Sequence, residues 1–208
     1  MNKEHTVKVN KGKQIGIYTA ILSLSAMLIE PVRTNAASTT GSTTINATVA
    51  ATISIATSTT VGISLVPTAA GSVSSSGDTV TINTNSTTGY TLSMTDANAD
   101  TSLTSGASTI PAHNGTQASP TALAANTWGY RVVNVGGFGS TTYNGESNIA
   151  GSTSTWAGVP ALGSPNTLKS TGTTATNDAT TVWYGVRATT AKPSGIYTDV
   201  VTYTAITN

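Results

Sequence analysis

Most of this chain alternates between apolar and polar side chains with a period of two. Between Ile45 and Ile55 every second residue is apolar. Shorter runs of the same kind follow at residues 61–65, 80–82, 90–94, 128–132 and 182–186. Such alternation places the apolar side chains on one face of an extended strand. No window after residue 38 keeps the 3.6-residue period of an amphipathic helix. The sequence therefore predicts an all-β protein.

Turn-forming residues separate these runs, which indicates antiparallel pairing. We expect turns at Ser74–Asp78 and Thr87–Gly89. The predicted fold is an antiparallel β-sandwich, Ig-like or jelly-roll-like, with about seven to nine strands, and a barrel is the alternative. Residues 96–125 and 134–176 lose the alternation. The first is expected to be a long loop with at most one short strand, and the second either has a function or hides strands.

The first 37 residues have the features of a bacterial-type export signal. Four lysines precede an apolar run, Ile15–Ile29, that is too short to span a bilayer of about 30 Å comfortably. Pro31 and small residues follow it. We expect cleavage after Ala36 or Ala37, so that residues 38–208 form a single secreted domain. An uncleaved N-terminal anchor is the alternative, because two charged residues precede the expected cleavage point.

The expected mature chain, residues 38–208, carries few charges. Its four basic and six acidic side chains give a formal net charge of −2. So few basic residues cannot neutralise a run of phosphates, which argues against nucleic-acid binding. The same span contains 40 Thr and 22 Ser, and Thr suits the solvent face of a sheet. The chain has no cysteine, so the domain must be held by its own core.

Catalytic residue patterns are nearly absent from this span. It has one histidine, His113, in the segment Pro111–Gly115, and no Gly-x-Ser-x-Gly elbow. A hydroxyl nucleophile needs a base to activate it. We expect His113 to be a solvated loop residue and the protein to be neither an enzyme nor dependent on a cofactor. Zinc binding is not expected from a single histidine without cysteine.

Residues 96–100 match the opening of a calcium-binding loop. Asp96, Asn98 and Asp100 alternate with alanine, as in the Asp-x-Asn-x-Asp pattern that presents oxygens to a hard cation. Thr101 and Ala107 stand where that pattern needs Gly and Glu. We therefore favour a turn in which these side chains bond their own backbone, with calcium as the weaker alternative.

Aromatic residues are the candidate binding groups. Trp156 lies among Gly and Ser and is the best single candidate for an exposed contact, although we slightly favour the alternative, a plug that covers the end of the sandwich. Trp183 is a second candidate. It is adjacent to Tyr184, so the two point to opposite faces, and either one is exposed or both faces are covered.

Two strand motifs resemble a known family. The first is Gly89-Tyr90-Thr91-Leu92, and the second runs from Gly195 through Tyr197, Asp199 and Tyr203 to Ala205. They resemble the Trp-x-Leu strands of bacterial WxL cell-surface proteins, with Tyr in place of both Trp residues and Ala205 in place of the second Leu. The closing strand also resembles those of secreted pilin-like and spore-coat-like β-sandwich proteins. The resemblance implies attachment to the cell wall, with Gly89, Tyr90, Leu92, Gly195, Tyr197, Asp199 and Tyr203 as motif residues.

These observations lead to one functional hypothesis and two alternatives. The first is an extracellular, non-enzymatic surface protein, structural or adhesive, that binds the cell envelope non-covalently through a wall polymer or other surface proteins. No apolar helix or sorting motif follows the last predicted strand, so no transmembrane anchor is expected in the mature chain. The second is a pilus or surface-layer subunit that forms homo-oligomers by strand exchange, donating its N-terminal alternating segment. The third is a secreted carbohydrate-binding or hydrolytic module.

Overall fold

The computed structural model describes residues 36–208. The chain divides into two units, residues 1–46 and residues 47–208. In the first unit the described residues, 36–46, are exposed and without regular secondary structure. The predicted export signal, residues 1–37, lies outside the described residues except for its last two positions. The second unit is the folded domain.

The domain is all-β, as predicted. No α-helix occurs among residues 36–208, and hence none that could cross a membrane. The elements in chain order are β1 (Ile53–Ala56), β2 (Ser72–Thr84), β3 (Tyr90–Asp96), β4 (Leu103–Ser105), β5 (Ser108–Ile110), β6 (Thr121–Ala122), β7 (Thr127–Arg131), the 3-10 turn η1 (Gly136–Phe138), β8 (Thr155–Trp156), β9 (Asn166–Ser170), β10 (Ala175–Ala188) and β11 (Val201–Thr207).

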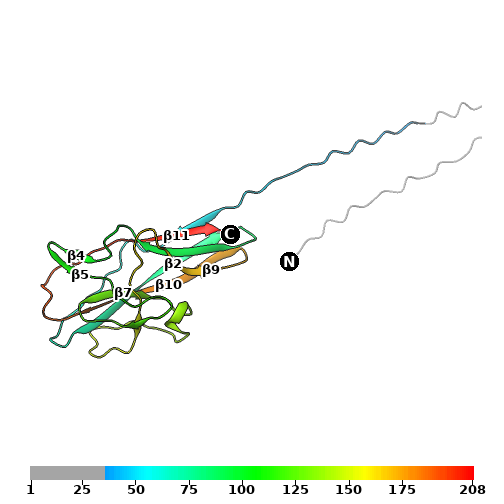
Figure 1. Cartoon of the computed structure of the whole chain (residues 1–208). Helices are drawn as coiled ribbons and strands as arrows, with labels where there is room; N and C mark the ends of the chain where they lie inside the picture. The colour runs from blue at the N-terminus through cyan, green and yellow to red at the C-terminus, as the bar shows by residue number, and fades with distance from the viewer. Residues whose placement is uncertain (1–35) are drawn as a thin grey trace, which may run out of the picture. The chain divides into compact units, whose positions relative to one another are not determined.

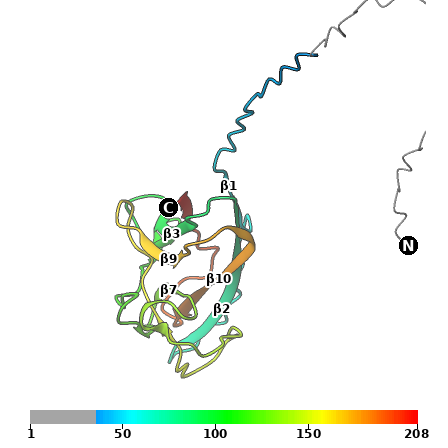
Figure 2. The same cartoon turned by 90° about the vertical axis from the view of Figure 1, so that its right-hand side faces the viewer.

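Two antiparallel sheets form a sandwich (Figure 1). One has four strands in the order β1-β2-β10-β7, and the other has three in the order β11-β3-β9. β2 and β10 are the longest strands, and Figure 2 shows them side by side, with β3 and β9 beyond them. Two short ribbons, β4-β5 and β6-β8, complete the domain.

The core lies between the two sheets. Alternate residues of β2, β3 and β10 point into it, as their period of two predicts. The fully buried members include Val80, Ile82, Leu92, Met94 and Val182, all at 0% exposure. Each such side chain contributes about 1.5–3 kcal/mol when it leaves water, so these strands supply much of the stability of a domain without disulfides.

The outer face of the four-stranded sheet is covered too. Trp183 is half-buried there, whereas its neighbour Tyr184 is buried on the core side. Both faces are therefore covered, one of the two arrangements that the adjacent pair predicted. Trp156 lies over Gly185 of β10, where an added Cβ would come within 2.5 Å of the indole ring. Together with Val73 and Leu123, these tryptophans form the outer-face cluster.

The structure differs from the predicted strand pattern at several places. Ser74–Asp78 was expected to be a turn but lies inside the 13-residue strand β2, because it pairs with β10 throughout. Residues 36–208 form eleven strands instead of the expected seven to nine. The additional ones lie in the two stretches without alternation: residues 96–125 hold three short strands rather than at most one, and residues 134–176 hide β8 and β9.

Candidate binding groove

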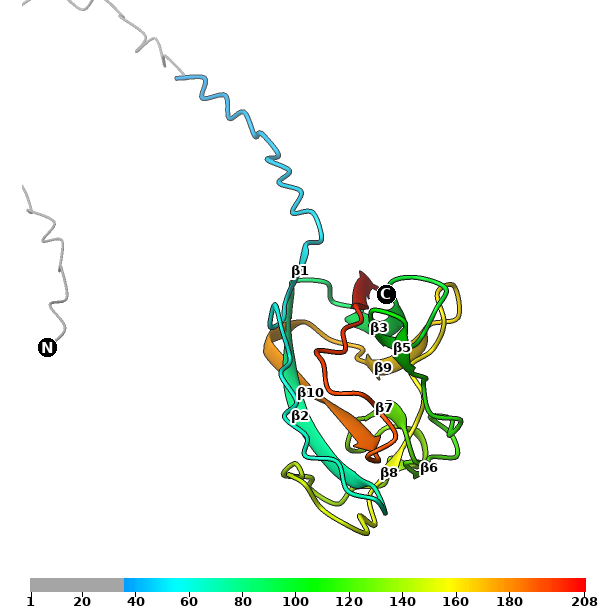
Figure 3. The same cartoon turned by 90° about the vertical axis from the view of Figure 1, so that its left-hand side faces the viewer.

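An open groove of about 1000 Å³ runs along one side of the sandwich. Its walls are residues 57–67 and residues 190–201. Figure 3 views this side: the cyan segment after β1 follows β2, and the red segment that leads to β11 passes in front of β10. The floor consists mainly of apolar residues from β5, β7 and β10.

The aromatic residues of the floor are fixed by bonds inside the domain. The rings of Trp128 and Tyr184 lie 6.3 Å apart, centroid to centroid. Trp128 donates its Nε1 proton to the carbonyl of Thr101 at 2.8 Å, and the hydroxyls of Tyr184 and Tyr203 are 2.6 Å apart. Burial raises the pKa of both phenols above its ordinary value, so both stay neutral at physiological pH. The floor is thus a rigid and largely apolar surface.

The first wall is an extended segment without a strand partner. Val61, Ile63 and Leu65 are half-buried against the core and alternate with exposed residues, as their pattern predicted. Only the ends of the segment are held: Ser58 N donates to Asp78 Oδ1 at 3.0 Å, and Val66 N donates to Asn148 Oδ1 at 2.6 Å. Among the described residues, no hydrogen bond reaches the backbone between them. The predicted strand at 61–65 therefore has the side-chain pattern of a strand but no ladder.

The second wall ends in an edge strand. β11 pairs with β3 on one side only, and β1 pairs with β2 in the other sheet, so the first and last strands do not pair. The half-buried face of β11 consists of Val201, Tyr203 and Ala205. Val200 and Ile206, on the other face, are more than half exposed. Edge strands present unpaired backbone groups to which a further strand can add. The groove therefore lies between a backbone without a partner, residues 59–65, and a wall that ends at the one free edge of β11.

The N-terminal alternating segment is only partly used as a strand. Of the predicted strand Ile45–Ile55, only its end enters β1, which begins at Ile53. Before it, the Asn85 side chain accepts a bond from Thr52 N at 2.7 Å and donates to Ala50 O at 3.0 Å. No hydrogen bond joins residues 47–49 to any other described residue. Ile45 and Val49 are 88% and 84% exposed, so the apolar side of this segment is uncovered.

The predicted binding tryptophans lie away from the groove. Trp156 is 0% exposed, so its predicted role as an exposed contact is wrong. Trp156 covers the outer face of the four-stranded sheet. The prediction had placed it over the end of the sandwich. Trp183 is half-buried beside Tyr143, with ring centroids 5.1 Å apart, and the Arg131 guanidinium lies 4.2 Å from the Tyr143 ring centre. These aromatic groups pack against each other instead of forming an exposed platform.

The two motif strands are neighbours in the three-stranded sheet. Tyr203 of β11 lies opposite Met94 of β3, and Tyr90 and Leu92 are fully buried in the core. Gly89 lies between a turn and the start of β3 with φ of +79°, and an added Cβ would lie 2.2 Å from the carbonyl of Thr171. The remaining motif residues, Gly195, Tyr197 and Asp199, line the second wall of the groove.

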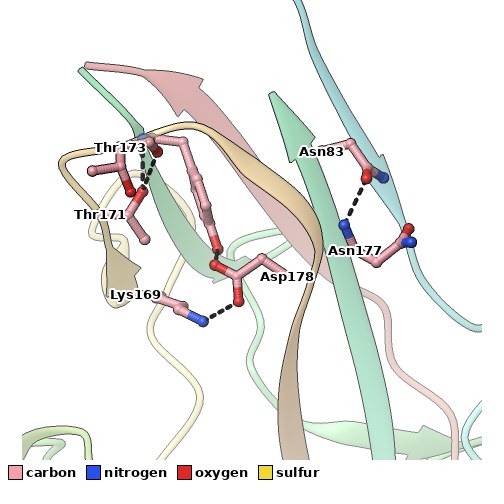
Figure 4. Close-up of polar contacts among 7 residues, drawn as sticks. Asn83, Lys169, Thr171, Thr173, Asn177 and Asp178 are labelled. Carbon is pink, nitrogen blue, oxygen red and sulfur yellow. Dashed lines mark hydrogen bonds and ion pairs between the residues drawn. The ribbon is translucent and has the colours of Figure 1, made fainter. Parts of the chain in front are cut away.

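A polar contact at Asp178 ties the sheets together (Figure 4). The hydroxyl of Tyr90 donates to Asp178 Oδ2 at 2.8 Å, and Lys169 forms an ion pair with the same carboxylate. Burial acts to raise the pKa of Asp178, but the bonds from Lys169 and Tyr90 hold this pKa below its usual value. One carboxylate of β10 thus joins β3 and β9 across the sandwich. Nearby, Asn177 N donates to Asn83 Oδ1 at 2.7 Å.

The 96–100 loop forms the turn that we favoured from the sequence. Asp96 Oδ1 accepts from Asn98 N at 2.9 Å, and Asn98 Oδ1 accepts from Asp100 N at 2.8 Å. Asp100 Oδ1 in turn accepts from Ser102 N at 3.1 Å. Each side chain therefore bonds the backbone two residues on. Among residues 36–208, no three His, Asp or Glu side chains converge in the manner of a metal site.

His113 is buried rather than solvated, at 7% exposure. Its Nε2 lies 2.8 Å from the hydroxyl of Thr121, and its Nδ1 accepts from Ala124 N at 3.4 Å. Burial lowers the pKa of His113 below its ordinary value. The predicted solvent exposure is therefore wrong, because the loops around this residue fold over it.

No family model, curated protein or solved structure matches this chain. The resemblance to WxL-like and pilin-like proteins thus rests on the motif residues alone. Function has to be argued from the domain.

Proposed function

We propose that this protein is an exported, non-enzymatic structural subunit of the cell surface that assembles by strand exchange. In this assembly the segment Ile45–Ala51 of one copy lies in the groove of the next copy. The observation that supports it is the presence, in one chain, of an uncovered alternating segment and of a largely apolar groove in which one wall, residues 59–65, has no backbone partner. The export signal expected from residues 1–37 would deliver the chain to the surface.

The segment and the groove are matched in length and polarity. Seven extended residues at about 3.3 Å each span about 23 Å, the same length as the unpaired residues 59–65. The apolar side chains Ile45 and Val49, with two alanines, would face the groove floor, and the polar residues between them would face solvent. Burying an Ile or Val side chain contributes about 1.5–3 kcal/mol, and new backbone hydrogen bonds would fix the register.

A second copy is a better donor than the same chain. The Asn85 side chain holds Ala50 and Thr52 in an extended conformation immediately before β1. From β1 the chain runs on directly into residues 57–67, the first wall of the groove. A segment that filled its own groove would need a reversal at residues 50–52, which the two bonds to Asn85 oppose. Donation to a neighbour requires no change there.

The third hypothesis, a carbohydrate-binding module, has less support. Its candidate binding residues were Trp156 and Trp183, which instead pack into the outer-face cluster. Assembly would give a surface protein many copies of any weak wall contact, so the structural role and non-covalent envelope association are compatible.

Size-exclusion chromatography with light scattering tests the proposal. Residues 38–208 should form concentration-dependent oligomers, whereas a variant that begins at Ile53 should be monomeric with an unchanged circular dichroism spectrum. Val49→Asp places a charge on the donated apolar face and should abolish assembly. Thr48→Asp, one residue away on the opposite face, is the matched control and should still assemble.

A peptide experiment tests the donated segment and the receiving groove separately. A labelled peptide of residues 44–52 should bind the variant that begins at Ile53, and the same peptide with Val49→Asp should not. If residues 38–208 stay monomeric at high concentration and the peptide does not bind, strand exchange is wrong.

A further inference from the structure

Two acidic side chains meet at the junction of β3 and the segment before β11. Asp96 ends β3 and is 0% exposed, and Asp199 lies two residues before β11. The pairing of the strands brings them together: Asp96 is opposite Val201, and Ala97 N donates to Val200 O at 2.9 Å. The Oδ2 atoms of both carboxylates are buried, and neither has a hydrogen-bond partner.

The other oxygens of this pair are already bonded. Asp96 Oδ1 accepts from Asn98 N, and Asp199 Oδ1 accepts from Val200 N at 2.8 Å and from the Asn98 amide at 3.5 Å. Burial, and secondarily the neighbouring Asp96, raise the pKa of Asp199 to about 6. Buried carboxylates that face each other repel when both are ionised, unless a cation lies between them.

The described part of the chain supplies no such cation. Lys169 pairs with Asp178, and Lys192 Nζ donates to the carbonyl of Thr109. Arg187 donates to two backbone carbonyls, and Arg131 lies over the ring of Tyr143 in the outer-face cluster. These are the four basic side chains of residues 38–208. The positive charge that the pair needs, a proton or a metal cation, must therefore come from solution.

We propose that a hard divalent cation, Ca²⁺ in the extracellular medium, binds between the Oδ2 atoms of Asp96 and Asp199. Carboxylate oxygens are the preferred ligands of Ca²⁺, and waters complete its coordination. The two negative charges match the charge of the ion. Asp100 takes no part, because its carboxylate caps the next turn. The ligand pair thus differs from the 96-98-100 pattern of the sequence, since it combines Asp96 with a residue 103 positions further on.

The site would act on the groove wall. Asp199 lies in that wall between Ile196 and Val201, whereas Asp96 belongs to the central strand of the three-stranded sheet. A cation that binds both would tie the second wall of the groove to the three-stranded sheet. This inference does not depend on strand exchange, because binding can be measured in the monomeric variant as well.

Isothermal titration calorimetry of CaCl₂ into the EDTA-treated exported protein at neutral pH is the test. We expect one site with Kd of about 10⁻⁴–10⁻³ M, typical of extracellular calcium modules, and a higher Tm with Ca²⁺ than with EDTA. Asp199→Asn should lose the binding heat and the Ca²⁺-dependent rise in Tm. In EDTA this variant should be more stable than the wild type, because one of the two facing charges is gone.

Asp100→Asn is the matched control and should bind Ca²⁺ as the wild type does. The proposal is overturned if Ca²⁺, Mg²⁺ and Mn²⁺ give neither heat nor a Tm shift in the wild type. A Tm that rises only on mild acidification would then show that a shared proton holds the pair. Loss of binding in Asp100→Asn but not in Asp199→Asn would equally contradict the assignment.

Discussion

Replacement of Trp156 by Ala should destabilise the whole domain, although the residue lies in a stretch rich in Gly and Ser. The indole ring is 0% exposed, rests on Gly185 and meets the ring of Tyr143 edge-on, with centroids 5.6 Å apart. Removing a large buried aromatic side chain costs about 3–5 kcal/mol, because apolar burial is lost and a cavity remains. From the sequence we would expect this substitution to leave folding intact, and the burial reverses that expectation.

The size of the effect follows from the usual stability of single domains. A loss of about 3–5 kcal/mol is a large part of a margin of about 5–15 kcal/mol. At about 2–4 °C per kcal/mol for a domain of this size, Tm should fall by about 6–20 °C. Trp156→Phe should cost clearly less, since most of the ring remains and the indole Nε1 has no hydrogen-bond partner to lose. Leu162→Ala, at a site 58% exposed, should change stability by about 0.5 kcal/mol or less.

Urea unfolding followed by far-UV circular dichroism measures these differences, because removal of a tryptophan would itself alter a fluorescence signal. The free energy of unfolding should rank in the order wild type, Leu162→Ala, Trp156→Phe and Trp156→Ala. If Trp156→Ala lies within about 1 kcal/mol of the wild type, the outer-face cluster is not a packed layer and the reasoning fails.

Three further predictions concern the ends of the chain and the buried His113. Deletion from Gly195 onward removes β11 and exposes the edge of β3, so the product should aggregate or fail to fold; a soluble, cooperatively unfolding product in chromatography and urea titration would show that β11 is dispensable. His113 has a lowered pKa, so the unfolded state binds a proton more readily and stability should decrease as pH falls below about 6.5; His113→Gln should reduce this decrease in urea titrations at several pH values. Mass spectrometry of the exported protein should find an N-terminus near Ser38, and an intact Met1 would contradict the export signal.

Local periodicity was a reliable guide where a strand buries one face in the core. β3 and the second half of β10 follow their alternation exactly as the pleat requires, because the pattern and the burial share the same period. The Ser74–Asp78 segment was misread because its small residues favour turns locally. Pairing with β10 overrides that preference, and Gly77 leaves room for the Trp183 ring opposite it, which a Cβ would approach to 3.3 Å.

The candidate sites depended on contacts between distant residues, and sequence reasoning could find only their parts. Residues 45–51 and 53–55 share one alternation, yet only the second group has a strand partner, and nothing local distinguishes them. Asp96 was singled out by its spacing in the loop and Asp199 by its place in a motif strand. Their meeting depends on the register between β3 and β11, which no short window contains. Burial of Trp156 likewise depends on Gly185 in a different strand.

Both faces of the four-stranded sheet are covered, and this limits which parts of the domain can move. The β2–β10 ladder lies between the core and the outer-face cluster, so its amide hydrogens are shielded from water and exchange only when the whole domain opens. β1 and β11 each pair on one side only and can separate from their neighbours at a lower free-energy cost. The two strands that adjoin the walls of the groove are therefore expected to open more easily than the central ladder. A foreign strand would enter or leave beside them while the central ladder stays intact.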